Sequence, residues 1–314
     1  MYEKIDLNIY CDEIKEARII DKFFGNENWI YFGVLIVPLN LEDELIERLC
    51  NMRCGNPAEG IIWGECKPKC QFHKKNNKEI HYQELQSYDQ FFIADRWLKF
   101  MLKDDKYTFF QILGIRMDLL DYPSFGQKSS TKRLEVIYNR FFRTTILKSV
   151  KSYFSKYNKI LVHNIFHDNA DIKRDYYFPW HSIYKIGKEE YKINFINPKI
   201  EFIESDHRIS NNKKSHLIQY IDVILGSFFN ALHWESKNEN KEKVALSIKP
   251  LLERIISKPN NKNSHYHYFK RKNVDFFPDR KMTTVEEFDM QIKGAMYKKR
   301  EIRIIRKSQE SLFQ

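Results

Sequence analysis

One carboxylate, Asp222, lies inside one of the most apolar stretches of the chain, residues 216–232. A carboxylate beside Ile221, Val223 and Leu225 loses hydration, so it must be paired, protonated or bound to a metal ion. The stretch predicts a helix over about 214–233. Gly226 in mid-helix costs about 1 kcal/mol relative to alanine and indicates close approach of another backbone. The alternative is a buried aspartate satisfied by a lysine, an arginine or a backbone donor.

A second acidic feature is the pair Asp12 and Glu13, which ends an apolar run that predicts a strand over Asp6–Asp12. Acids at the end of a strand occupy the edge of a sheet, where open α/β folds usually place their sites. Two carboxylates at Asp12 and Asp222 would repel by roughly 4 kcal/mol at about 4 Å and an effective dielectric near 20. A divalent cation would relieve that repulsion, so we interpret both positions as parts of a metal-binding acidic cluster. Alternatively, Asp12 and Glu13 begin a surface turn.

A third acidic segment, Glu79-Ile-His-Tyr-Gln-Glu84, offers a further carboxylate. In a strand, Glu79 and His81 would face the same side. Glu84 would begin the following helix. Asp168 and Asp206 follow later predicted strands, in positions more typical of loop residues than of ligands.

The remaining periodicity predicts strands alternating with helices, and hence a mixed α/β layered domain. Strands are expected over 29–37, 107–117, 159–167, 191–195 and 200–204. Helices are expected over 39–51, 88–103, 129–157 and 243–257. We predict one α/β domain over 1–257, with a cysteine-rich insertion over 50–78, and a basic-aromatic extension with a terminal helix over 258–314.

The net charge of +11 is unevenly distributed along the chain. Residues 1–65 hold 6 Lys and Arg against 13 Asp and Glu, whereas residues 66–314 hold 47 against 29. This distribution suits an enzyme that binds a polyanion, although a biased genome composition would also explain it. No apolar run is long enough to span a bilayer, and no basic-then-apolar leader opens the chain, so we expect a soluble cytoplasmic protein with no membrane partner.

The order of these motifs resembles a known family. Asp-Glu after the first strand, a Glu-Ile-His motif, and Ile-Gln-x-x-Asp-x-x-x-Gly in a late helix are similar to the domain of unknown function 3800 (DUF3800) family. The resemblance covers about residues 5–235. The chain departs from the family pattern at Ile14-Lys15, where a small residue and glycine are usual, and at Tyr220-Ile221, where Leu-Ala is usual.

The resemblance implies an RNase H-like fold and an association with mobile elements and anti-phage defence. It also implies an acidic triad of Asp12, Glu79 and Asp222, with Glu13 and His81 nearby as catalytic residues. Such a set would bind Mg²⁺ or Mn²⁺ and hydrolyse phosphodiester bonds in DNA or RNA. The expectation is therefore a metal-dependent nuclease, with a possible protein partner in a defence or toxin-like system.

The cysteines suggest a second kind of metal site. Cys50, Cys54, Cys66, Cys70 and His73 lie in a predicted loop and offer soft ligands for a structural Zn²⁺. The first spacing has three intervening residues, whereas a zinc knuckle usually has two. The alternative is a set of reduced thiols.

The segment after residue 258 combines aromatic and basic side chains. Tyr266 and Tyr268 precede Lys270, Arg271 and Lys272, a pattern that can stack bases and bind phosphates. An aromatic segment docked on the core is the alternative interpretation.

Two other functions stay open at this point. One is a nucleic-acid-binding module without catalysis, and the other is an interaction subunit of a larger assembly. The sequence contains no Walker loop, dinucleotide-binding fingerprint or Gly-x-Ser-x-Gly elbow, which removes the commonest ATP, NAD and serine-hydrolase functions.

Overall fold

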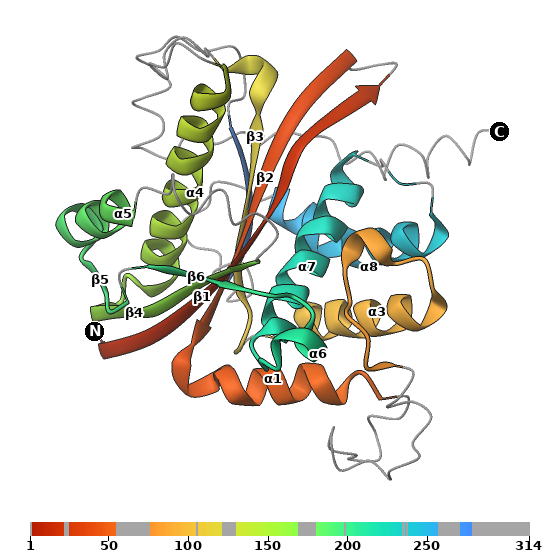
Figure 1. Cartoon of the computed structure of the whole chain (residues 1–314), viewed down its shortest axis with the longest axis horizontal. Coiled ribbons are helices and arrows are strands. Elements are labelled where there is room, and N and C mark those ends of the chain that lie inside the picture. Colours follow the sequence, from red (N-terminus) through yellow and green to blue (C-terminus); the bar gives the residue numbers. More distant parts are fainter. Residues whose placement is uncertain are drawn as a thin grey trace.

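A mixed β-sheet forms the centre of the molecule (Figure 1). The computed structural model describes residues 2–21, 25–54, 76–104, 106–120, 130–168, 180–197, 199–233, 236, 238–256 and 271–277. Within them, the sheet has seven strands: β1 (Tyr2–Asp21), β2 (Gly25–Pro38), β3 (Phe109–Arg116), β4 (Tyr157–Asp168), β5 (Ile193–Phe195), β6 (Ile200–Ile203) and β7 (Lys272–Phe277).

The strand order is β5-β4-β1-β2-β3-β7, with β6 also paired to β4. β1, β2 and β3 form an antiparallel meander. β4 lies parallel to β1, and the short β5 and β6 lie parallel to β4. β7 adds to the opposite edge, parallel to β3. The expected class, a mixed α/β fold with helices flanking an open sheet, is confirmed.

Helices cover both faces of the sheet (Figure 1). α4 packs on one face, and α7, α8, α3 and α1 form the layer on the other. The described helices are α1 (Glu42–Asn51), α3 (Tyr88–Lys103), α4 (Ser130–Phe154), α5 (Trp180–Ile186), α6 (His207–Ser210), α7 (Ser215–His233) and α8 (Glu239–Ile256), with 3-10 turns η1 (Leu39–Leu41), η3 (Tyr82–Glu84) and η4 (Met117–Leu119) and the π-helix η7 (Gly187–Tyr191). None of the helices described is long and apolar enough to cross a membrane.

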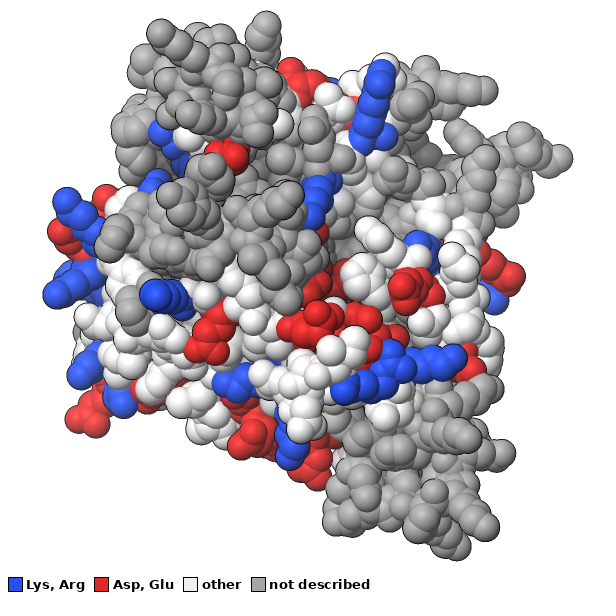
Figure 2. Space-filling model, viewed as in Figure 1, with Lys and Arg blue, Asp and Glu red and all other residues white. Residues whose placement is uncertain are grey.

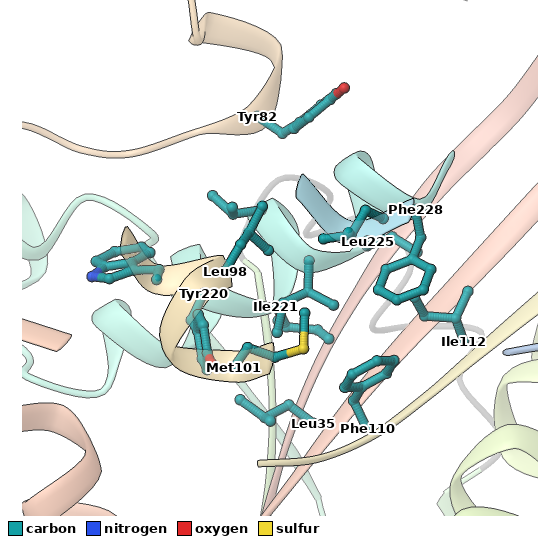
Figure 3. Close-up of a cluster of buried hydrophobic side chains, with 14 of the residues drawn as sticks. Leu35, Tyr82, Leu98, Met101, Phe110, Ile112, Tyr220, Ile221, Leu225 and Phe228 are labelled. Atoms are coloured by element: carbon teal, nitrogen blue, oxygen red, sulfur yellow. The ribbon is translucent and has the colours of Figure 1, made fainter. Parts of the chain in front are cut away.

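α7 is the central helix of its layer. Ile221 and Leu225 pack toward the sheet residues Leu35, Phe110 and Ile112, as Figure 3 shows. Every residue of α7 is buried except Asp222. Burying an aliphatic side chain of this kind contributes about 2 kcal/mol, so the packing fixes the rotation of the helix. That rotation in turn fixes the direction in which Asp222 points.

Three elements differ from the sequence-based expectation. β1 does not end at Asp12: it pairs with β2 as far as Asp21, through a bulge between Ile14 and Ala17. Pairing with β4, however, stops at Cys11 and His167, so Asp12 lies where its parallel neighbour ends. The segment 79–81 is not a strand but an irregular stretch before η3. The third difference lies beyond residue 258, where β7 belongs to the main sheet rather than to a separate extension.

Candidate active site

Two carboxyl groups from distant parts of the sequence meet just beyond the point where the pairing of β1 with β4 ends. Asp12 comes from β1 and Asp222 from α7, and their carboxyl groups share a hydrogen bond. The side chain of Asp222 is 16% exposed, so the pair is mostly, but not wholly, removed from solvent. The central sequence-based expectation, that these two residues lie together, is therefore met.

The electrostatics of the pair favour a shared proton. Loss of solvation raises the pKa of Asp12 well above its usual value, and the charges of Asp222, Glu13 and Asp168 raise it further. Burial also raises the pKa of Asp222 to about 7, even though hydrogen bonds from Tyr82 and Asp12 lower it. Two carboxylates that cannot both ionise readily behave as one coupled acid. The pair therefore retains a proton more readily than two isolated aspartates would, because ionising both carboxyls places two like charges together.

Glu79 and Asp168 extend the pair to a set of four acids, Asp12, Glu79, Asp168 and Asp222, called the acidic group below. The Ser205 hydroxyl donates to Glu79 Oε1, and Glu79 is only partly buried. Burial raises the pKa of Glu79, opposed by the Ser205 hydrogen bond and by His81, while Asp206 and Asp168 raise it further. The charges of Glu79 and Asp168 both act on Asp222. Asp168, which the sequence indicated as a loop residue, is thus part of the same electrostatic group.

The segment that carries Glu79 is held against α7 by backbone hydrogen bonds to side chains. The Tyr82 N–H donates to Asp222 Oδ2 at 2.6 Å, and the Ile80 N–H donates to Gln219 Oε1 at 3.1 Å. These bonds take the place of a strand ladder, which explains why the segment is irregular. A Cβ added at Gly226 would lie 2.2 Å from Tyr82 Cγ. Gly226 therefore makes room for this segment, although the approaching group is an aromatic side chain rather than a backbone.

His81 lies beside the pair without a hydrogen bond to it. Its Nδ1 is 3.7 Å from Asp222 Oδ2. Nδ1 also accepts the Gln83 N–H at 3.2 Å, so the ring proton is on Nε2 in this arrangement. The Nε2–H group of His81 can thus donate a hydrogen bond to a ligand. Glu84 is exposed at the end of η3 and has no hydrogen bond to the acidic group among the described residues.

Glu13 is on the other face of the sheet. Its Oε2 lies 2.7 Å from His167 Nε2, and the Tyr138 hydroxyl donates to the same oxygen at 3.1 Å. The alternation of side chains along β1 separates Glu13 from Asp12 in this way. The Glu13 N–H donates to Asp12 Oδ1 at 2.8 Å, and the charge of its side chain acts on Asp12 from the other face.

A buried arginine, Arg53, holds the chain just before Glu79 by hydrogen bonds. Its guanidinium donates to the backbone oxygens of Asn76 and Lys78 at 3.2 and 2.6 Å, and to Gln219 Oε1 at 2.6 Å. Burial lowers the pKa of Arg53 to about 10, which still leaves it charged at neutral pH. Because Gln219 also receives the Ile80 N–H, one arginine links the chain before Glu79 to α7. No sequence pattern predicts this role of Arg53.

The cysteine and tail predictions are only partly within the described residues. Cys50 and Cys54 are buried, and burial raises the pKa of Cys50 to about 11. Cys66, Cys70, Tyr266, Tyr268 and Lys270 lie outside the described residues. Arg271 begins the turn into β7. Lys272 is fully buried and donates to the Asp104 carbonyl, so its expected contact with nucleic acid is wrong.

The acids of the site offer oxygen ligands of the kind that Mg²⁺ and Mn²⁺ bind. Among the described residues, no group of three or more His, Cys, Asp and Glu is arranged so that it could hold a metal ion. Mg²⁺, however, prefers oxygen ligands and is often bound by one or two carboxylates together with substrate phosphates. Asp12 and Asp222 are two such carboxyls in direct contact. The chemistry of the pair therefore fits a hard divalent cation.

The residues that sequence reasoning underrated share one signal. Asp168 is the last residue of β4, which lies parallel to β1, and Ser205 comes two residues after β6, which lies parallel to β4; both are at carboxyl ends of strands, where sites of open sheets form. The ends of neighbouring parallel strands lie close together in space, so these strand ends, taken as a set, indicate the site.

Comparisons with protein-family models, with curated proteins and with solved structures found no match for the chain.

Proposed function

We propose that the protein is a divalent-metal-dependent nuclease with an RNase H-like fold. The observation that carries the proposal is the contact between Asp12 and Asp222, which lie 210 positions apart in the sequence. Two carboxyls that are held together and partly shielded from water destabilise the fold unless a proton or another cation binds between them. Such uncompensated groups are typical of functional sites.

The strand arrangement also supports the proposal. An antiparallel β1-β2-β3 meander followed by a parallel β4 beside β1 is the arrangement expected of an RNase H-like sheet. Together with the motif order, it favours membership of the DUF3800 family. A role as an effector in anti-phage defence, with a protein partner, is part of the same proposal and rests on that resemblance.

The proposed chemistry is hydrolysis of a phosphodiester bond. Mg²⁺ or Mn²⁺ held by Asp12, Asp222 and Glu79 would polarise the phosphate and activate water. Asp168 adds negative charge that strengthens cation binding. His81, with its N–H on Nε2 and its ring partly exposed, is suited to donating a hydrogen bond that orients the attacking water.

The test is cleavage of labelled single- and double-stranded DNA and RNA with Mg²⁺, Mn²⁺ or EDTA. We expect cleavage only with metal, and a loss of more than about a hundredfold in Asp222→Asn, since even outer partners of metal ligands reach that loss. Asp95→Asn is the matched control, because Asp95 is also a buried helical aspartate but pairs with Lys99 in α3. Cleavage that persists in Asp222→Asn would contradict the proposal.

A nucleic-acid-binding module without catalysis is the second candidate. The observation that favours it is the lack, among the described residues, of a ready-made three-ligand metal group. It predicts binding that weakens steeply with salt and no product with any metal.

A further inference from the structure

The segment between the acids Asp206 and Asp222 contains no other acid. It carries Arg208, Lys213 and Lys214 and forms α6 and its connection to α7. Figure 2 shows acidic side chains gathered in the middle of one face of the molecule, with a row of basic side chains directly beside them. A juxtaposition of this kind is suited to a ligand whose own negative charge must be held next to a cation site.

Arg208 is the cation of this segment whose position is best defined. Its Nε donates to Asp206 Oδ1 at 2.9 Å, and its Nη2 donates to Oδ2 at 2.6 Å. Asp206 is fixed in turn, because it caps α6 by accepting the Arg208 N–H at 2.9 Å. The Arg208 guanidinium is therefore held in one orientation before any ligand binds, which reduces the conformational entropy lost on binding.

The free edge of this guanidinium is available to solvent. The Arg208 side chain is 47% exposed, and its Nη1 makes no hydrogen bond to the described part of the chain. Asp206 directly follows Ser205, the residue that donates to Glu79, and the charge of Glu79 acts on Arg208. The guanidinium thus lies at the rim of the acidic group rather than at a distant surface.

We propose that Arg208 binds a backbone phosphate of nucleic acid beside the Asp12–Asp222 pair. This inference rests on the proposed function and names the residue that positions the substrate there. A planar guanidinium with a free N–H edge matches a phosphate better than a lysine does, because it can donate two parallel hydrogen bonds. Asp206 then acts as the positioning residue of Arg208. Lys213, which is exposed, and Lys214 continue the positive segment along the same connection.

Binding is measured separately from cleavage, so that the two proposals can fail independently. Asp222→Asn protein in EDTA is titrated into short fluorescein-labelled single- and double-stranded DNA and RNA, and anisotropy is followed at salt concentrations between about 50 and 200 mM. Arg208→Ala is added to this background and is expected to weaken binding about tenfold and to lower the salt slope by about 1. Arg208→Lys is expected to recover only part of the loss.

Arg48→Ala is the matched control. Arg48 is 50% exposed and also pairs with a carboxylate, Glu44, at 2.8 Å, but it lies on α1. We expect binding to be unchanged in this variant, and both variants to keep the unfolding temperature of their parent within a few degrees. Equal loss in both variants, no loss in Arg208→Ala, or no binding of any probe would overturn the inference. Metal-dependent cleavage by the wild type in that case would still leave the nuclease proposal standing.

Discussion

Asp12 and Glu13 are neighbours in β1, but their side chains point to opposite faces of the sheet, and the two faces treat a carboxylate differently. On the α4 face, Glu13 meets His167, whose side chain is 7% exposed, and the charges compensate each other. On the α7 face, Asp12 meets Asp222, and like charges face each other. A compensated pair needs no ligand, whereas an uncompensated pair is stable only with a bound proton or cation. Glu13 is thus in the setting of a structural carboxylate, whereas Asp12 is in the setting expected of the proposed site.

Breaking the compensated pair has the largest expected effect on stability. Burial alone would lower the pKa of His167, but the charge and hydrogen bond of Glu13 raise it to about 9. His167→Leu leaves Glu13 buried without its partner, which costs about 3–5 kcal/mol. Denaturant unfolding at pH 7 measures this loss. A cost below about 1 kcal/mol would show that the pair is not the main stabilising contact on this face.

Removing one member of the uncompensated pair should act in the opposite direction. The pKa of Asp222 is raised from 3.8 to about 7, so its protonated form stabilises the fold below about pH 4, and this stabilisation is lost as the pH rises through 7. Asp222→Asn avoids that loss. At pH 8 without metal, it should gain on the order of 2 kcal/mol over the wild type, and little at pH 4. Urea unfolding at both pH values tests this, and an equal change at both would contradict it.

Gly226→Ala tests whether the Glu79 segment must lie against α7. The new methyl would clash with the Tyr82 ring, and the clash outweighs the gain in helix propensity by about 1 kcal/mol. We expect a small loss of stability with a much larger loss of cleavage, because the segment carrying Glu79 must move. Gly114→Ala is the control: its Cβ would also clash with an aromatic ring, that of Tyr31, but it lies in β3 and does not contact the Glu79 segment. Full activity in Gly226→Ala would show that close contact is unnecessary.

The smallest expected effect is stabilisation by metal. Mg²⁺ at about five times its dissociation constant should stabilise the wild type at pH 8 by about 1 kcal/mol, or roughly 2 °C in Tm. Asp222→Asn should not respond. Scanning calorimetry measures both, and an equal shift in the two proteins would mean that Mg²⁺ binds elsewhere.

The elements with strong periodicity could be predicted from the sequence. The helix over 88–103 has the predicted bounds, and α7 differs by one residue at its start. The meeting of Asp12 and Asp222 could also be predicted, because a carboxylate in an apolar helix needs a partner. The rest depended on tertiary contacts. The charged continuation of β1 is a strand only because β2 pairs with it, and the segment before η3 is irregular because its N–H groups bind Asp222 and Gln219.

Site membership was harder to predict than the fold. The sequence placed Glu13 and Asp12 in one site, although strand alternation turns them to opposite faces. Asp168 was underrated because its neighbours in space come from β1 and α7 rather than from its own segment. Lys272 looked like a surface cation in a basic run, but its pairing in β7 buries it.

The position of α7 in the chain has a consequence for synthesis on the ribosome. The β1-β2 hairpin emerges early, yet Asp12 has no Asp222 beside it until α7 has been made, and β7 joins β3 later still. Contacts between such distant segments form slowly and late. A nascent chain that ends before residue 215 therefore carries only one member of the acidic pair, and the pair cannot form until α7 has left the ribosome.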